Sequence, residues 1–123
     1  MSNVIIKELT DFVVKHLGYT DRKLIRQYIK KHLEYGTCDF AFDNNDKIAY
    51  VCRWNIEGKK AVILDFAIAP EYRNHKGFIK WVLAKNLIRF PYVRFIEFKR
   101  QRKYMNRGKR IYAVVELLRR KNG

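Results

Sequence analysis

The chain has 123 residues and a mass of 14.9 kDa, which is the size of one domain. Hydrophobic residues make up 48% and aromatic residues 15%, so a packed core can form and disorder over the whole chain is excluded. The net charge of +15 is uneven, because residues 1–72 hold 11 basic and 10 acidic side chains, whereas residues 73–123 hold 16 and two. We therefore expect one domain over residues 1–123, with a short flexible basic tail at about 119–123 and an anionic partner.

Cysteine and histidine usage argues against a disulfide scaffold and against a metal site. Cys38 and Cys52 are the only cysteines and lie in strand-like stretches, so we expect two small buried side chains. His16, His32 and His75 are scattered, and no Cys/His cluster has the spacing of zinc ligands. No window approaches the ~20 apolar residues of a membrane span. We expect a cytoplasmic protein without membrane contact, in the host cytoplasm if the chain is viral.

The first third of the chain predicts two helices. Residues 5–17 place apolar side chains at helical spacing, and a glycine follows them. Residues 21–34 repeat this spacing, and Gly36 is expected to end the second helix. Thr20 and Asp21 can cap the second helix, since a short side-chain oxygen accepts a hydrogen bond from the first turn.

Three strands are expected next, over residues 37–42, 47–55 and 60–69. Asp- and Asn-rich or glycine-containing turns separate them. The third stretch, KAVILDFAIA, is almost continuously apolar, which is typical of a strand buried on both faces. It should therefore be central in its sheet, and Pro70 ends it.

The remaining pattern predicts a helix over residues 77–90, stopped by Pro91, and a strand over 92–99. A basic stretch follows, and residues 111–118 predict a last strand. The order is α-α-β-β-β-α-β-β. It predicts an α+β fold, a three-layer α/β/α arrangement around a mixed, mostly antiparallel sheet.

Two short sequence motifs narrow this fold prediction. The central strand runs into IAPEYR at residues 68–73, and YMNRG follows the next strand, with Tyr104 four residues before Gly108. In this element order, they resemble the GNAT N-acetyltransferase superfamily. The resemblance implies acetyl-CoA or another acyl-CoA as cofactor and a β-bulge in the central strand. The bulge leaves backbone amides free for the pantetheine arm, and a loop before the next helix binds the pyrophosphate.

The resemblance also implies a set of cofactor-binding positions at the end of the central strand and in the following loop. They are Ile68, Ala69, Arg73, Asn74, His75, Lys76, Gly77 and Phe78. The loop departs from the family pattern Q/R-x-x-G-x-G/A. Counted from Arg73, the two small positions hold Lys76 and Phe78; counted from Asn74, Gly77 falls correctly but Ile79 takes the last position.

Candidate catalytic residues follow from the same resemblance. Tyr104 is the expected general acid that returns a proton to the leaving thiolate. Asp65 and Glu97 are the carboxylates on the central and next strands that could serve as a base. Each of the three also fits an ordinary role, as a packing tyrosine or a polar strand residue.

A basic face is expected around residues 94–112, with Tyr104 and Tyr112 interleaved. Its members are Arg94, Lys99, Arg100, Arg102, Lys103, Arg107, Lys109 and Arg110. Arginine can bond phosphates in a bidentate way and tyrosine can stack on bases, so nucleic acid or an acidic protein is the expected partner. A solvated charge run is the plainer alternative.

Three functional interpretations remain open. The first is an acyl-CoA-dependent N-acyltransferase that transfers an acyl group, such as acetyl, to an amine. The second is a catalytically inactive protein of the same fold that binds nucleic acid or an acidic partner through the basic face. The third is a small viral or mobile-element protein that acts on a host complex. The sequence leaves the acyl acceptor and the oligomeric state open.

Overall fold

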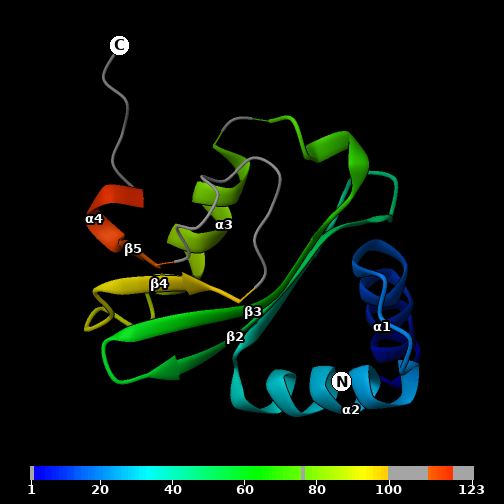
Figure 1. The fold of residues 1–123 in the computed structure, drawn as a ribbon. Coiled ribbons are helices and arrows are strands. Elements are labelled where there is room, and N and C mark those ends of the chain that lie inside the picture. Colours follow the sequence, from blue (N-terminus) through cyan, green and yellow to red (C-terminus); the bar gives the residue numbers. More distant parts are fainter. Residues whose placement is uncertain (1, 76, 100–110, 118–123) are drawn as a thin grey trace. The chain divides into compact units, whose positions relative to one another are not determined.

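The computed structural model describes residues 2–75, 77–99 and 111–117 (Figure 1). The chain divides into two compact units: unit 1 is Met1–Trp54 with Asp65–Asn74, and unit 2 is Asn55–Leu64 with His75–Gly123. The elements are α1 (Asn3–Leu17), α2 (Arg22–Tyr35), β1 (Cys38–Phe42), β2 (Ile48–Glu57), β3 (Lys60–Ile68), the 3-10 turn η1 (Pro70–Tyr72), α3 (Phe78–Leu87), β4 (Phe95–Phe98), β5 (Ile111–Ala113) and α4 (Val114–Leu117).

The five described strands form one mixed sheet in the order β1-β2-β3-β4-β5. β1 pairs antiparallel with β2, β3 pairs parallel with β4, and β4 pairs antiparallel with β5. β3 is the middle strand, and of its nine residues only Lys60 and Leu64 are not buried. The α+β class and the predicted element order are confirmed.

Capping residues set the ends of the first two helices. α1 begins two residues before its predicted start, because the Ser2 side chain accepts a hydrogen bond from the Ile5 amide at 3.3 Å. Asp21 caps α2 as predicted, accepting from the Leu24 amide at 3.0 Å. Gly18 follows α1 in the left-handed conformation, with φ of 71°, which glycine adopts at little cost.

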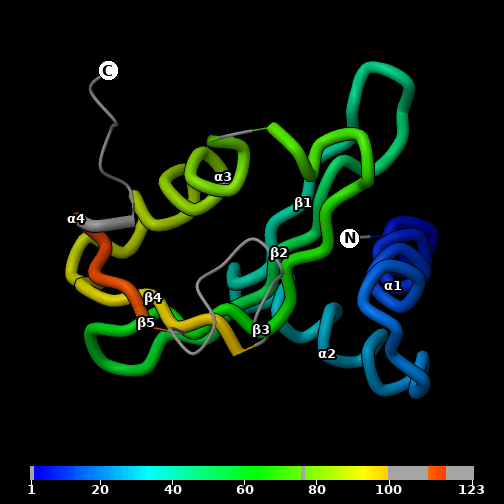
Figure 2. Tube along the Cα trace, turned by 45° about the horizontal axis from the view of Figure 1, so that its top comes forward, coloured from blue at the N-terminus to red at the C-terminus, as the bar shows by residue number. Residues whose placement is uncertain are grey.

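The core of unit 1 lies between the two N-terminal helices and one face of the strands. One cluster of buried residues joins Leu9 and Val13 of α1, Ile25 and Ile29 of α2, and Val51 of β2. Figure 1 shows α1 and α2 on the same side of the strands, and Figure 2 shows β1 running beside β2. The helical spacing of apolar residues in the sequence therefore marks a buried face in each helix.

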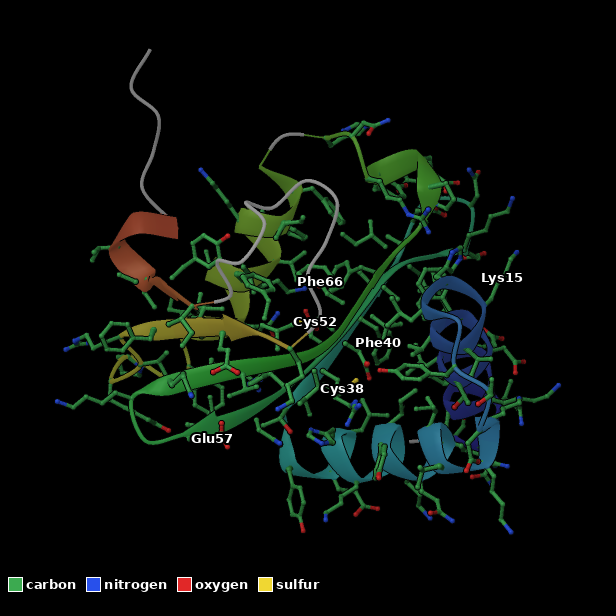
Figure 3. The ribbon with its side chains drawn as sticks, viewed as in Figure 1. Lys15, Cys38, Phe40, Cys52, Glu57 and Phe66 are labelled. Carbon is green, nitrogen blue, oxygen red and sulfur yellow. The ribbon has the colours of Figure 1, made fainter. Side chains whose placement is uncertain are left out.

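Side chains along the strands of unit 1 alternate between the two faces of the sheet. Cys38 and Phe40 on β1 pack against the helices, and Phe66 on β3 lies on the opposite side (Figure 3). Cys52 is fully buried on β2, and burial raises the pKa of the Cys38 thiol to about 12. Both thiols are therefore packing groups, as the sequence suggested.

Unit 2 holds α3 and the last strands. The buried face of α3 carries Val82, Leu83 and Leu87, and β4 contributes the buried residues Ile96 and Phe98. Both elements are shorter than predicted, because α3 ends at Leu87 and β4 begins at Phe95. No helix among the described residues is long and apolar enough to cross a membrane.

The predicted last strand over residues 111–118 is wrong beyond its first three residues. β5 ends at Ala113, and residues 114–117 form α4. The antiparallel register places Ala113 opposite Phe95, the first residue of β4, and the Val114 amide donates to the Arg94 carbonyl at 2.8 Å. β4 offers no strand beyond that point, so the β-branched residues that follow have no ladder to join. The predicted tail at about 119–123 lies outside the described residues.

Candidate functional site

The parallel pairing of β3 with β4 covers only the first half of β3. It runs from Lys60 opposite Phe95 to Ile63 opposite Phe98. The Lys99 amide adds a final hydrogen bond to the Ile63 carbonyl at 3.0 Å. β4 then ends, whereas β3 continues to Ile68.

The alternation of backbone hydrogen-bonding groups along β3 is also broken after Ile63. In a regular strand the N–H and C=O groups of alternate residues point to the same neighbouring strand. The backbone carbonyl of Ile63 points to β4, because it accepts from Lys99. The backbone groups of Ala69, six residues later, should therefore point to β4 as well. Its amide instead donates to the Ala49 carbonyl of β2 at 2.9 Å. We infer that one extra residue breaks the alternation between Ile63 and Ala69, which is the signature of a β-bulge.

The turn that follows β3 is fixed within unit 1. Pro70–Tyr72 forms η1, and the Arg73 amide closes it on the Pro70 carbonyl at 3.3 Å. The Tyr72 hydroxyl donates to the Asp43 carboxylate at 3.3 Å, and burial together with that negative charge raises the pKa of Tyr72. Hydrogen bonds from the Lys47 and Asn45 amides lower the pKa of Asp43.

The Arg73 side chain bonds to groups of unit 1. Its Nε donates to the Ile68 carbonyl at 2.8 Å, and its Nη2 lies 2.9 Å from Nδ1 of His16 on α1. Because a guanidinium can only donate, His16 accepts at Nδ1, which requires an imidazole without a proton on that nitrogen. Burial and the charge of Arg73 lower the pKa of His16, which favours this state. Of the predicted cofactor positions, Ile68, Ala69 and Arg73 are thus joined by contacts within unit 1.

The start of α3 carries the remaining predicted cofactor positions. Gly77 precedes the helix with φ of 88°, and a side chain placed there would meet no heavy atom within 4 Å. No side chain caps the helix at this residue. Asn74 and His75 are exposed, and the Phe78 ring lies 6.1 Å from that of Trp81. Lys76 lies outside the described residues.

Asp65 is the centre of a buried polar network in unit 1. Its side chain is only 1% exposed and accepts a hydrogen bond from Nε of Arg53 at 2.6 Å. The Tyr19 hydroxyl donates to its other oxygen. The Tyr28 ring covers the Arg53 guanidinium at 5.1 Å. These contacts give Asp65 a structural role, because both carboxylate oxygens hold protein groups in place.

Of the other predicted site residues, the structure describes only Glu97, Arg94 and Lys99. Glu97 on β4 pairs with Lys60 on β3 at 2.9 Å, and both are half-buried. Tyr104 lies outside the described residues. Within the basic face, Arg94 and Lys99 are exposed. The members outside the described residues are Arg100, Arg102, Lys103, Arg107, Lys109 and Arg110.

Sequence reasoning missed an open groove of about 530 Å³ in unit 1. It is bordered by one stripe of α1, the start of β2 and the end of β3. The lining residues are Glu8, Asp11, Phe12, Lys15, His16, Asp46, Lys47, Ile48, Ala69, Pro70 and Glu71. The helical spacing of the polar residues on α1 was visible in the sequence. Their closeness to Pro70 and Glu71 required the fold, since about 55 residues separate the segments.

Comparisons with known proteins identify the fold. No protein-family profile and no curated protein matches the sequence. An acetyltransferase of the GNAT family from Staphylococcus aureus Mu50 is similar in structure, with a TM-score of 0.60 and 15% identity over 80% of this chain and 68% of that one. A GNAT family acetyltransferase from Brucella melitensis, solved in complex with acetyl-CoA, has a TM-score of 0.53 and 13% identity over 80% and 70%.

A third structure, a predicted acetyltransferase from Pyrococcus horikoshii, gives a TM-score of 0.59 and 17% identity over 79% of this chain. The chain spans only about a third of that protein, 35% of its length. At sequence identities this low, the structural similarity establishes the fold alone. The chain has the GNAT acetyltransferase fold, as the IAPEYR sequence and the element order suggested.

Proposed function

We propose that the protein is a GNAT-like N-acyltransferase that moves an acyl group from acyl-CoA to an amine. One observation carries the proposal: among the described residues β4 accompanies β3 only as far as Ile63, and the regular alternation of β3 is broken between Ile63 and Ala69. A strand interrupted in this way has backbone amides that a ligand can use, and the resemblance implies the pantetheine arm there. The Brucella melitensis protein of the same fold was solved with acetyl-CoA bound, which supports this assignment.

The pyrophosphate is assigned to the first turn of α3. A helix N-terminus favours anions because its first amides lack partners within the helix. Gly77 leaves open space at this point, and its φ of 88° suits glycine. These features support the reading of the loop that starts at Asn74, in which Gly77 takes the glycine position. Arg73 is not assigned to the phosphates, because it binds His16 and the Ile68 carbonyl.

The reaction is direct attack of an unprotonated amine on the thioester carbonyl. Backbone amides of β3 beyond Ile63 would stabilise the oxyanion that develops there. Tyr104 remains the candidate general acid that protonates the leaving thiolate. Asp65 and Glu97 are both ion-paired, so we assign the base to neither, and the amine would lose its proton to water.

Calorimetric titration with acetyl-CoA tests the proposal. We expect saturable binding, and a Gly77→Asp variant should weaken it at least ~10-fold, since a carboxylate would face the pyrophosphate. Gly58→Asp is the matched control: Gly58 is also left-handed, with φ of 61°, and also open. It should bind as the wild type does. Absence of binding at millimolar acetyl-CoA would remove the enzyme interpretation.

Tyr104→Phe tests the chemical step separately. If the hydroxyl protonates the thiolate, this variant should bind acetyl-CoA normally but release CoA thiol ~10²-fold more slowly in the presence of amines. Equal rates for the variant and the wild type would withdraw the role of Tyr104 and leave the binding proposal intact.

A second candidate function is that of an inactive binding protein of this fold, of viral or mobile-element origin. The engagement of Arg73 by His16 favours it, because this arginine of the predicted phosphate loop is used elsewhere. The basic face around residues 94–112 would then bind nucleic acid or an acidic protein. Salt-dependent mobility shifts together with absent acetyl-CoA binding would support this candidate.

A further inference from the structure

The outer side of α3 and the turn after it expose large side chains to solvent. Trp81 is 54% exposed, Ile88 is 78% exposed and Tyr92 is 50% exposed. Lys85 and Arg89 are exposed between them. We refer to these five residues as the α3 surface. Trp81 and Lys85 lie one turn apart on α3, and Ile88, Arg89 and Tyr92 follow in the cap and turn after the helix.

Cations lie next to the aromatic rings of this region. Lys85 Nζ is 5.2 Å from the centre of the Trp81 ring, and Arg89 Cζ is 5.5 Å from that of Phe90. The Phe90 ring in turn meets Tyr92 edge-on at 6.4 Å. Each ring can therefore offer a stacking surface with a positive charge beside it.

The sequence around α3 carries a strong excess of positive charge. Residues 73–96 contain six lysine and arginine side chains and no aspartate or glutamate. A helix that serves only as a solvated surface usually carries both signs of charge. The combination of exposed rings and this excess of positive charge is complementary to a polyanion that also presents flat, apolar faces.

We propose that the α3 surface binds single-stranded nucleic acid. An unpaired base stacks on Trp81, and Lys85 and Arg89 contact the neighbouring phosphates. A duplex keeps its bases stacked inside and cannot use the ring. An anionic membrane fits less well, because α3 has only ten residues and Lys85 lies between the exposed side chains of Trp81 and Ile88. The proposal depends neither on acyl transfer nor on residues 94–112.

Tryptophan fluorescence provides a direct assay, because Trp54 is only 2% exposed and quenching by a ligand reports on Trp81. Addition of an oligothymidylate of about 20 nucleotides should quench this emission. Anisotropy of a labelled oligonucleotide then measures the affinity of variants. Trp81→Ala should weaken binding by about 5- to 150-fold at every salt concentration, with the salt slope unchanged.

Removing a charge should have a different signature. Lys85→Gln should lower the slope of log affinity against log salt by about 0.7, the value for one phosphate contact on a single strand. Trp81→Phe, which keeps a ring, should recover part of the affinity that Trp81→Ala loses. Loss of affinity without these two signatures would contradict stacking and phosphate contact.

The chain contains a matched control pair in unit 1. Lys31 Nζ lies 5.9 Å from the ring of Tyr35 on α2, and Tyr35 is 68% exposed. The double variant Lys31→Gln/Tyr35→Ala removes the same chemistry and should bind within about twofold of the wild type. An equal loss in this control would show that any exposed cation and ring suffices, and would overturn the assignment to α3.

Three further measurements distinguish single-stranded nucleic acid from other possible ligands of the α3 surface. Duplex DNA bound as tightly as the single strand, or displacement of the oligonucleotide by CoA at equimolar concentration, would overturn the proposal. A blue shift of Trp81 emission with phosphatidylglycerol vesicles and no quenching by the oligonucleotide would assign the surface to a membrane instead. Binding of acetyl-CoA together with the oligonucleotide, without competition, would support a nucleic-acid surface separate from the cofactor site.

Discussion

The two units of the molecule differ most in how they use charge. Unit 1 holds 10 basic and nine acidic side chains, whereas unit 2 holds 17 basic and three acidic ones. In unit 1 charged groups meet each other inside the fold, as Arg53 and Asp65 do. In unit 2 exposed lysines and arginines lie beside aromatic rings. The excess of positive charge thus lies almost entirely in unit 2, for which we have proposed an anionic partner.

The largest expected effect is the loss of the buried ion pair. Asp65→Asn should lower the free energy of unfolding by about 3–5 kcal/mol, since it leaves the Arg53 guanidinium buried without its counter-ion. Chemical denaturation measures this change. The double variant Arg53→Met/Asp65→Leu should recover most of the loss because no charge remains unpaired. If Asp65→Asn alone is neutral, the pair does not hold unit 1 together.

The counterpart in unit 2 is the pair of Lys60 and Glu97. Glu97→Gln should destabilise the protein far less than Asp65→Asn, because solvent screens this half-exposed pair. The same denaturation assay compares the two. Similar losses would remove the distinction between a structural ion pair in unit 1 and a peripheral one in unit 2.

Two isoleucines give a matched test of the apolar faces. Ile29 on α2 is fully buried in unit 1, and Ile88 after α3 is 78% exposed. Ile29→Ala should cost about 2–5 kcal/mol in unfolding free energy, through lost burial and a cavity. Ile88→Ala should change it by less than about 0.5 kcal/mol. A large cost for Ile88→Ala would mean that the α3 surface is covered in the folded protein.

Replacing a left-handed glycine by alanine should lower the free energy of unfolding by about the same amount in both units. Gly18 after α1 and Gly58 after β2 have φ of 71° and 61°, and neither has a heavy atom near the position of an added Cβ. Alanine at either site should therefore lower stability only through backbone strain, by about 1–2 kcal/mol. Thermal unfolding of the two variants checks this. A clearly larger cost at one site would reveal packing that geometry does not show.

The smallest effect concerns two histidines of unit 1. Burial lowers the pKa of both His16 and His32 below the ordinary value of 6.5. The unfolded chain then takes up protons first, so their contribution is complete above pH 6.5 and is lost as pH falls through the folded pKa values. Unfolding free energy should be lower at pH 5 than at pH 7.5. His32→Gln should reduce this difference, and an unchanged pH dependence would contradict it.

Local patterns predicted most of unit 1 correctly because caps and apolar spacing act over a few residues. Asp21 and the glycines after α1 and α2 set helix ends through bonds to their own helices. The apolar run of β3 likewise predicted a central strand. Unit 2 was predicted less well, because the end of β5 depends on where β4 begins, and strand partners are distant in sequence.

The candidate site shows the same division. The sequence located the IAPEYR segment and the glycine before α3, since both are local features of backbone and composition. It could not show that Arg73 reaches His16, a residue 57 positions earlier, or that the Tyr19 hydroxyl bonds Asp65 from 46 positions away. Two residues thought to be functional are therefore held by contacts that only folding creates.

By itself, the sequence determined the order of elements, their caps, the central buried strand and the concentration of positive charge after residue 72, because these depend on neighbouring residues or on composition. Only the tertiary structure decided where the pairing of β3 with β4 ends, which side chains bond to one another and which rings remain exposed on α3. Those outcomes depend on strand partners and on packing between distant segments, and the free energy of a side-chain contact is defined only once both partners are in place.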